Sequence, residues 1–151
     1  MNWNQNRSVK LSQGCLIAFA ALLTATDIGG YWLTQWALSI ARTLRGPWDG
    51  ALLMATLYAC SALAWVLLFA LWRLLWNMQK GVVFDARNVR YLRMTSWCCF
   101  GACLVCFASS LYWPPIMLVA IAAGFVGLIV RIVKNVFEQA ITMKDELDFT
   151  V

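Results

Sequence analysis

Residues 94–130 read MTSWCCFGACLVCFASSLYWPPIMLVAIAAGFVGLIV and contain no charged side chain. An α-helix needs about 20 apolar residues to cross a bilayer, so this stretch is too long for one crossing and nearly long enough for two. Pro114 and Pro115 favour a turn between the two, because a proline disfavours helical backbone in the residue before it and suits the first turn of a helix. The stretch therefore predicts membrane-spanning helices over about 95–112 and 115–133.

Two further spans are predicted before this stretch. The run from Gly50 to Trp72 is uncharged and long enough to cross with some tilt, which predicts a span over about 51–73. Residues 16–38 predict the first span, in which the pair Gly29–Gly30 favours a bend. The expected fold class is all-α: an integral membrane four-helix bundle formed by residues 1–151 as a single domain.

Composition excludes a soluble domain and much enzyme chemistry. Hydrophobic residues make up 62% of the 151 residues and charged residues only 13%, whereas soluble domains have about 25% charged residues. The chain contains no histidine, which excludes imidazole ligands, histidine bases and nucleophiles activated by histidine. We therefore expect a non-enzymatic protein of the lipid bilayer, with no cofactor and no direct nucleic-acid binding.

The distribution of basic residues predicts the orientation in the membrane. Four spans place both termini and the connection over residues 77–94 on the same side. Ten of the twelve basic residues fall on that side, all except Arg42 and Arg45. Because short cytoplasmic segments are enriched in Lys and Arg, both termini are predicted to be cytoplasmic.

Asp27 is the one acidic residue inside a predicted span. A carboxylate is costly in hydrocarbon, so it is a candidate proton or cation site, and Tyr31, one helical turn later, is expected to supply a hydrogen bond. With this site the chain would be a small proton-coupled transporter or a cation-binding membrane protein. The alternative is that Asp27 lies near the outer surface and is hydrogen-bonded where the helix bends.

Six cysteines invite a metal or redox interpretation, since Cys99, Cys103 and Cys106 share one helix face. We favour a packing role. Tetrahedral metal sites draw their ligands from separate elements as a rule, and a buried cysteine behaves as a small apolar side chain. A redox relay is discounted because neither outer loop contains a cysteine pair.

Amphipathic helical extensions of the third and fourth spans are expected on the cytoplasmic side. Asp85 can cap a helix that carries Val89 and Leu92 on one stripe. In the tail over residues 134–151, apolar side chains such as Phe137 share a face opposite charged ones. These apolar faces could pack on each other, on lipid headgroups or on a partner protein, and the sequence leaves the choice open.

Both extensions resemble an uncharacterised family of small four-helix bacterial inner-membrane proteins. The residues that carry the resemblance are Phe84, Asn88, Leu92, Arg93, Phe137, Ala140, Lys144, Glu146, Asp148, Thr150 and Val151. The chain departs from the family pattern at Leu147, where the family has Asn, and at Phe149, where it has Leu. Members are often encoded beside a small Cro/C1-type helix-turn-helix regulator. The resemblance therefore implies a protein of the bacterial inner membrane that holds or modulates such a regulator.

The leading hypothesis is a membrane protein that presents a cytoplasmic interaction surface to this kind of regulator. The residues expected to bind the partner are Phe84, Asn88, Leu92, Phe137, Asp148, Thr150 and Val151. The alternative function is the proton or cation site at Asp27 and Tyr31. A homo-oligomer is also plausible, because the pairs Ala120/Gly124 and Ala123/Gly127 permit close helix approach, although they can equally pack within one chain.

Overall fold

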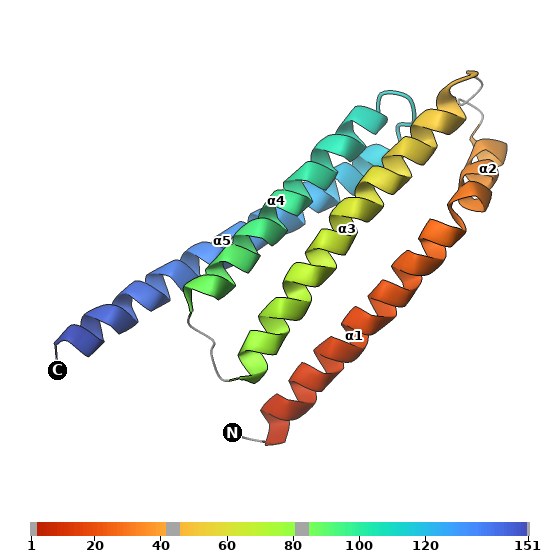
Figure 1. The fold of residues 1–151 in the computed structure, drawn as a ribbon. Helices are drawn as coiled ribbons and strands as arrows, with labels where there is room; N and C mark the ends of the chain where they lie inside the picture. The colour runs from red at the N-terminus through yellow and green to blue at the C-terminus, as the bar shows by residue number, and fades with distance from the viewer. Residues whose placement is uncertain (1–2, 42–45, 81–84, 151) are drawn as a thin grey trace.

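The computed structural model describes residues 3–41, 46–80 and 85–150, which form five helices (Figure 1). They are α1 (Trp3–Ile28), α2 (Gly30–Ile40), α3 (Asp49–Gln79), α4 (Ala86–Ser109) and α5 (Ile116–Phe149). No strand occurs in these three ranges, and four of the helices are long and apolar enough to cross a membrane. The predicted all-α membrane fold is therefore confirmed.

The first apolar segment is broken at the glycine pair. Gly29 separates α1 from α2, yet its amide donates to the Ala25 carbonyl at 2.9 Å and its carbonyl accepts from the Leu33 amide at 2.9 Å. The helical hydrogen bonds therefore continue around the bend. A Cβ atom at Gly30 would lie 3.2 Å from the Tyr58 hydroxyl of α3, so glycine permits a close approach of α2 to α3 at this point.

The helices pack in chain order. α1 and α2 lie against α3, α3 against α4, and α4 against α5, whereas α1 contacts neither α4 nor α5 within the described residues (Figure 1). The bundle is therefore open, with α1 and α5 at its two edges.

Small residues bring α4 and α5 together. A Cβ atom at Gly124 would lie 3.1 Å from the Cys103 sulfur, and one at Gly127 would lie 3.1 Å from the Cys99 Cβ. Ala120, on the same helix, is buried. Of the small residues considered for an oligomer interface, Ala120, Gly124 and Gly127 therefore serve packing within this chain, while the oligomeric state stays a prediction.

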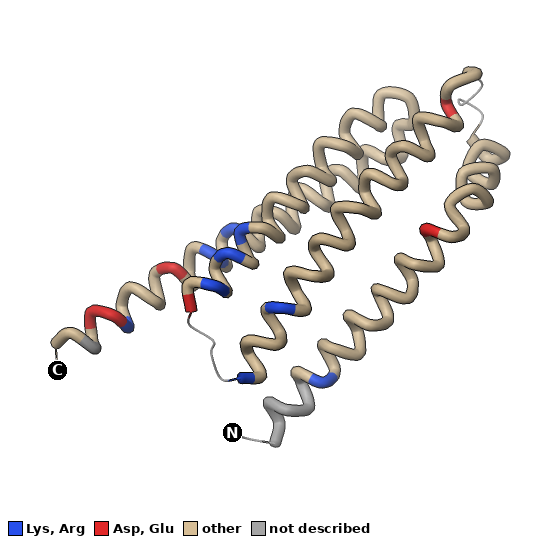
Figure 2. The backbone as a smooth tube through the Cα atoms, in the orientation of Figure 1, with Lys and Arg blue, Asp and Glu red and all other residues tan. Residues whose placement is uncertain are grey.

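The two ends of the bundle differ in charge. The start of α1 and the end of α5 lie at the same end (Figure 1), and most of the coloured basic residues lie toward that end (Figure 2). We call it the basic end; it is the end predicted to be cytoplasmic. Asp85 caps α4 there by accepting a hydrogen bond from the Arg87 amide at 3.2 Å, as predicted.

The last helix extends well beyond the apolar section of the bundle. α5 has 34 residues and is about 50 Å long at 1.5 Å per residue. Its uncharged part ends at Val130. Residues 131–149 therefore continue as a helix on the far side of the charge boundary, where Figure 1 shows α5 reaching past the other helices.

Candidate functional site

Asp27, in the last turn of α1, has three hydrogen-bond partners on α3. The Ser61 hydroxyl donates to one carboxylate oxygen at 2.5 Å, and the Trp65 indole N–H donates to the other at 3.0 Å. The Tyr58 hydroxyl donates to the Asp27 backbone carbonyl at 3.4 Å. Because these residues are spaced three and four apart, one face of α3 supplies all three donors.

The position of Asp27 along the bundle follows from these contacts. Ser61 is the middle residue of the uncharged run Gly50–Trp72. Its hydrogen bond therefore places the carboxylate opposite the middle of that run, while α2 carries the chain further away from the basic end. The depth of Asp27 in the membrane, including the alternative of a position near the outer surface, stays a prediction.

Tyr31 does not take the place expected for it. Its side chain is exposed on α2, and none of the hydrogen bonds among the described residues joins it to Asp27. The donors come instead from Tyr58, Ser61 and Trp65, which the sequence reasoning missed as partners. The sequence did contain a signal for these partners, because Tyr58, Ser61 and Trp65 are polar side chains on one face of an apolar span.

The partners of the Asp27 carboxylate are all neutral. Within the described ranges, no ion pair involves this residue. An unneutralised charge in low-dielectric surroundings is unfavourable, and two neutral donors offset only part of that cost. A bound proton or a small cation would remove the remaining charge, so the arrangement is chemically suited to exchange either one.

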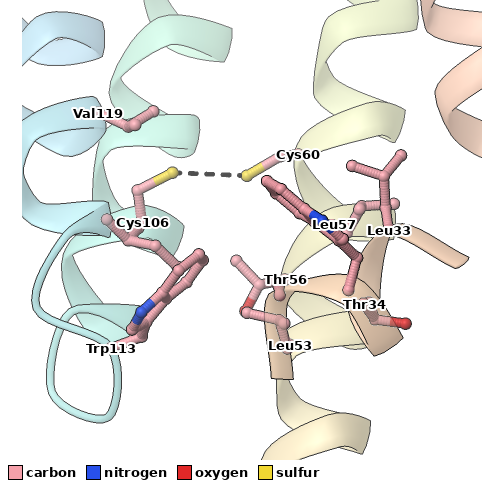
Figure 3. A pocket seen from close by; sticks show the side chains of 12 residues that line it. Leu33, Thr34, Leu53, Thr56, Leu57, Cys60, Cys106, Trp113 and Val119 are labelled. Atoms are coloured by element: carbon pink, nitrogen blue, oxygen red, sulfur yellow. Dashed lines mark hydrogen bonds between the residues drawn. The ribbon is translucent and has the colours of Figure 1, made fainter. Parts of the chain in front are cut away.

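A second feature is an apolar cavity of about 270 Å³ toward the end opposite the basic end, lined by residues of α2, α3, α4 and α5. Figure 3 shows Cys60 of α3 and Cys106 of α4 facing each other at its wall, with their sulfur atoms 3.6 Å apart. No group of three or more metal-binding side chains occurs in the part of the chain that was searched, the described residues. Cys99 and Cys103 instead fill the space beside Gly127 and Gly124.

Two of the residues expected to bind a partner lie inside the fold. Asn88 is 0% exposed and its side-chain oxygen accepts a hydrogen bond from the Asn77 amide at 2.8 Å, which links the start of α4 to the end of α3. Leu92, one turn later, is also buried. In this structure both side chains hold α4 in place at the basic end.

The other expected partner residues are spread along α5 or fall outside the described part. Phe137 is half-buried, whereas Thr150 is exposed and its hydroxyl donates to the Leu147 carbonyl at 2.9 Å. Phe84 and Val151 lie outside the described residues, as does the side chain of Asp148. Among the described side chains, Asn88 and Leu92 lie inside the fold while Phe137 and Thr150 lie on α5 and at its end, so a shared partner surface stays a prediction.

An ion cluster joins α4 to α5 at the basic end. Glu138 accepts from Arg93 at 3.1 Å through one oxygen and pairs with Lys134 at 3.0 Å through the other. The hydrogen bond from Lys134 lowers the pKa of the Glu138 carboxyl, partial desolvation opposes this shift, and Arg93 adds to the lowering. The cluster fixes the start of the α5 extension against α4.

The end of α5 is both apolar and acidic. Met143, Leu147 and Phe149 are exposed, the last two at 68% and 91%. Residues 142–150 contain one basic residue and three acidic ones, a net charge of −2 in a chain whose net charge is +5. We call residues 142–150 the α5 tip.

Comparisons with known proteins give a family and no closer relative. The comparison with curated proteins found no match, and neither did the comparison with solved structures. A family model described as "Protein of unknown function (DUF2975)" matches residues 32–151. The match includes α3, α4 and α5 with both extensions and the α3 partners of Asp27, and it begins after Asp27 itself. The chain therefore belongs to the DUF2975 family.

Proposed function

We propose that this membrane protein is non-enzymatic and holds a basic cytoplasmic protein, a small helix-turn-helix regulator, through the α5 tip. The observation that carries the proposal is the exposure of Met143 and Leu147 on a helix that has left the apolar section. Met143 and Leu147 are four residues apart and so lie on one face. An amphipathic helix of this kind binds a partner by placing its apolar face in a groove.

The charge of the α5 tip supports a basic partner. Its three acidic side chains, Asp145, Glu146 and Asp148, outweigh Lys144. A DNA-binding regulator carries a basic surface that contacts phosphates, and an acidic helix is complementary to such a surface. Binding at the tip would compete with DNA for the same basic surface, which is a direct way to hold a regulator inactive at the membrane.

The same charge disfavours lipid as the occupant. Membrane-surface helices are rich in Lys and Arg because the cytoplasmic leaflet is negatively charged. The acidic α5 tip would be repelled by that leaflet. Between the lipid headgroups and the partner protein that the sequence left open, a protein fits this segment better.

Cross-linked co-purification from native membranes tests the proposal. The wild type is expected to bring down a small basic helix-turn-helix protein, identified by mass spectrometry. The double variant Met143→Gln/Leu147→Gln is expected to lose most of it, while Asn135→Ala, an exposed change earlier on α5, keeps it. Equal recovery with all three proteins, or recovery of no such regulator, would contradict the proposal.

The second candidate function is a proton or small-cation site at Asp27, in a small transporter or cation-binding protein. The hydrogen bonds from Ser61 and Trp65 favour it, because they hold a carboxylate opposite the middle of an apolar span. Asp27→Asn keeps the shape and removes the charge. It is expected to abolish cation- or proton-dependent thermal protection and flux in proteoliposomes, while Asp49→Asn retains both. Unchanged behaviour of Asp27→Asn would reject this candidate.

A further inference from the structure

A polar cavity lies between α4 and α5 where the apolar section ends. It has a volume of about 200 Å³ and is lined by Arg93, Ser96, Trp97, Arg131 and Lys134. One water molecule occupies about 30 Å³ in the liquid, so the space accommodates a group several times larger. Three of its five lining side chains are cationic.

The cavity lies at the depth of the membrane surface. Arg93 is the last charged residue before the uncharged stretch 94–130, and Arg131 is the first one after it. One turn deeper, the Ser96 hydroxyl donates to the Gly127 carbonyl at 3.2 Å, which fixes the register of the two helices. Both arginines therefore lie at the border between the apolar section and the basic end.

The position of Trp97 supports placing the cavity at the level of the membrane surface. Its side chain is 65% exposed on the outside of α4, directly beside the cavity. Tryptophan is enriched at the membrane–water interface, where its ring contacts the upper acyl chain and its N–H reaches polar groups. A lipid beside the cavity would meet an aromatic wall at the level of its glycerol.

The cavity has a surplus of positive charge. Arg93 and Lys134 share the single carboxylate of Glu138, whereas Arg131 has no ion pair within the described residues. Three cations and one anion leave a net charge of about +2. The half-withdrawn Lys134, only 14% exposed, is already paired with Glu138, so the charge left for an added anion is mainly that of the exposed Arg131.

We propose that this cavity binds the phosphate group of an anionic membrane lipid from the leaflet at the basic end. A guanidinium binds phosphate through paired N–H donors, and a lysine ammonium adds a point charge. Basic pockets between membrane helices recognise anionic headgroups in this way. A lipid fits better than free phosphate because the site opens at the border of the apolar section beside Trp97, where acyl chains continue from the headgroup. The inference is independent of the proposed role of the α5 tip.

Native mass spectrometry of the detergent-solubilised full chain tests the site with phosphatidylglycerol as the probe and phosphatidylcholine as the neutral comparison. The wild type is expected to bind phosphatidylglycerol in preference to phosphatidylcholine. Arg131→Gln is expected to weaken phosphatidylglycerol binding about fivefold, the loss typical of one basic residue near an anionic lipid surface. Arg131→Lys, which keeps the charge, is expected to retain most of the binding.

Arg87→Gln is the matched control, because Arg87 is an exposed arginine of α4 at the same end but outside the cavity. It is expected to bind phosphatidylglycerol as the wild type does. Lys134→Gln removes a second cation from the cavity and tests the same prediction if Arg131→Gln does not fold. Equal weakening by Arg87→Gln and the cavity variants, or equal binding of the two lipids, would overturn the site.

Inorganic phosphate distinguishes the source of the anion. If the site takes a lipid, inorganic phosphate at the same concentration leaves phosphatidylglycerol bound. If it displaces the lipid at equal concentration, the lipid is not the preferred ligand and the proposal is overturned in favour of a soluble phosphate.

Discussion

The Ser61 hydroxyl donates a hydrogen bond to the Asp27 carboxylate at 2.5 Å, opposite the middle of the longest uncharged section of α3. This bond and the one from Trp65 fix the end of α1 to α3 at the point where the first apolar segment bends. Since α1 packs against no helix beyond α2 and α3 in the described structure, these bonds add directed contacts to its apolar packing on α3.

Removing the Ser61 hydroxyl is therefore expected to destabilise the bundle. Ser61→Ala deletes a hydrogen bond to a charged group, with an expected cost of about 2 kcal/mol in the free energy of unfolding. Thermal or denaturant unfolding in detergent measures it. Ser39→Ala, which removes an exposed hydroxyl from α2, is the control and should cost much less. If the Asp27→Asn and Ser61→Ala effects on stability simply add, the two side chains do not interact as the structure indicates.

The close contact of α4 and α5 predicts an effect of a single methyl group at Gly127. Gly127→Ala would place a Cβ 3.1 Å from the Cys99 Cβ and is expected to cost about 1–3 kcal/mol through overpacking. Gly14→Ala is the matched control, because nothing lies within 4 Å of the added atom there. It should leave stability unchanged or slightly raised. Equal unfolding temperatures for the two variants would show that α4 and α5 are not this close.

Asn88 is expected to behave as a structural residue. Asn88→Ala removes a fully buried side chain and leaves the Asn77 amide without its partner, so we expect a loss of about 1–3 kcal/mol in unfolding free energy. Arg90→Ala, an exposed change on the same turn, should cost little. A stable Asn88→Ala protein that has lost its regulator would instead support the direct partner contact predicted from the sequence.

The ion cluster at Glu138 predicts a pH dependence. Its pKa is lower in the folded chain than the ordinary value of 4.5, because Lys134 and Arg93 stabilise the charged form. The contribution to stability is therefore complete above pH 4.5 and is lost as pH falls through the lowered folded pKa. Melting temperatures compared between pH 7 and pH 3 should fall further for the wild type than for Glu138→Gln. Parallel pH profiles would mean that the cluster contributes nothing measurable.

The fold could be predicted because a membrane permits few backbone structures for an apolar segment. Uncharged runs of known length must become crossing helices, and the turn at Pro114–Pro115 and the cap at Asp85 depend only on local backbone chemistry. Asp27 could be singled out for the same reason: a carboxylate within such a run needs partners.

The hydrogen-bond partners of Asp27 could not be predicted, because they depend on which helices pack together. The hydropathy of the sequence does not determine how the helices pack. Tyr31 is near Asp27 in sequence, but the bend at Gly29 turns α2 onward and α3 supplies the donors. Asn88 was expected at a partner surface because it is one of the residues that carry the family resemblance. It is buried because α3 continues past the membrane section as far as Asn77 and covers it.

Site-specific photocrosslinking tests the role of the α5 tip most directly. A photoreactive residue at position 147 is compared with one at position 118, since Leu147 and Leu118 are both exposed on α5 but only the first lies beyond the apolar section. The account predicts an adduct with a small basic helix-turn-helix protein at position 147 and adducts with lipid alone at position 118. Adducts with lipid alone at both positions would contradict it.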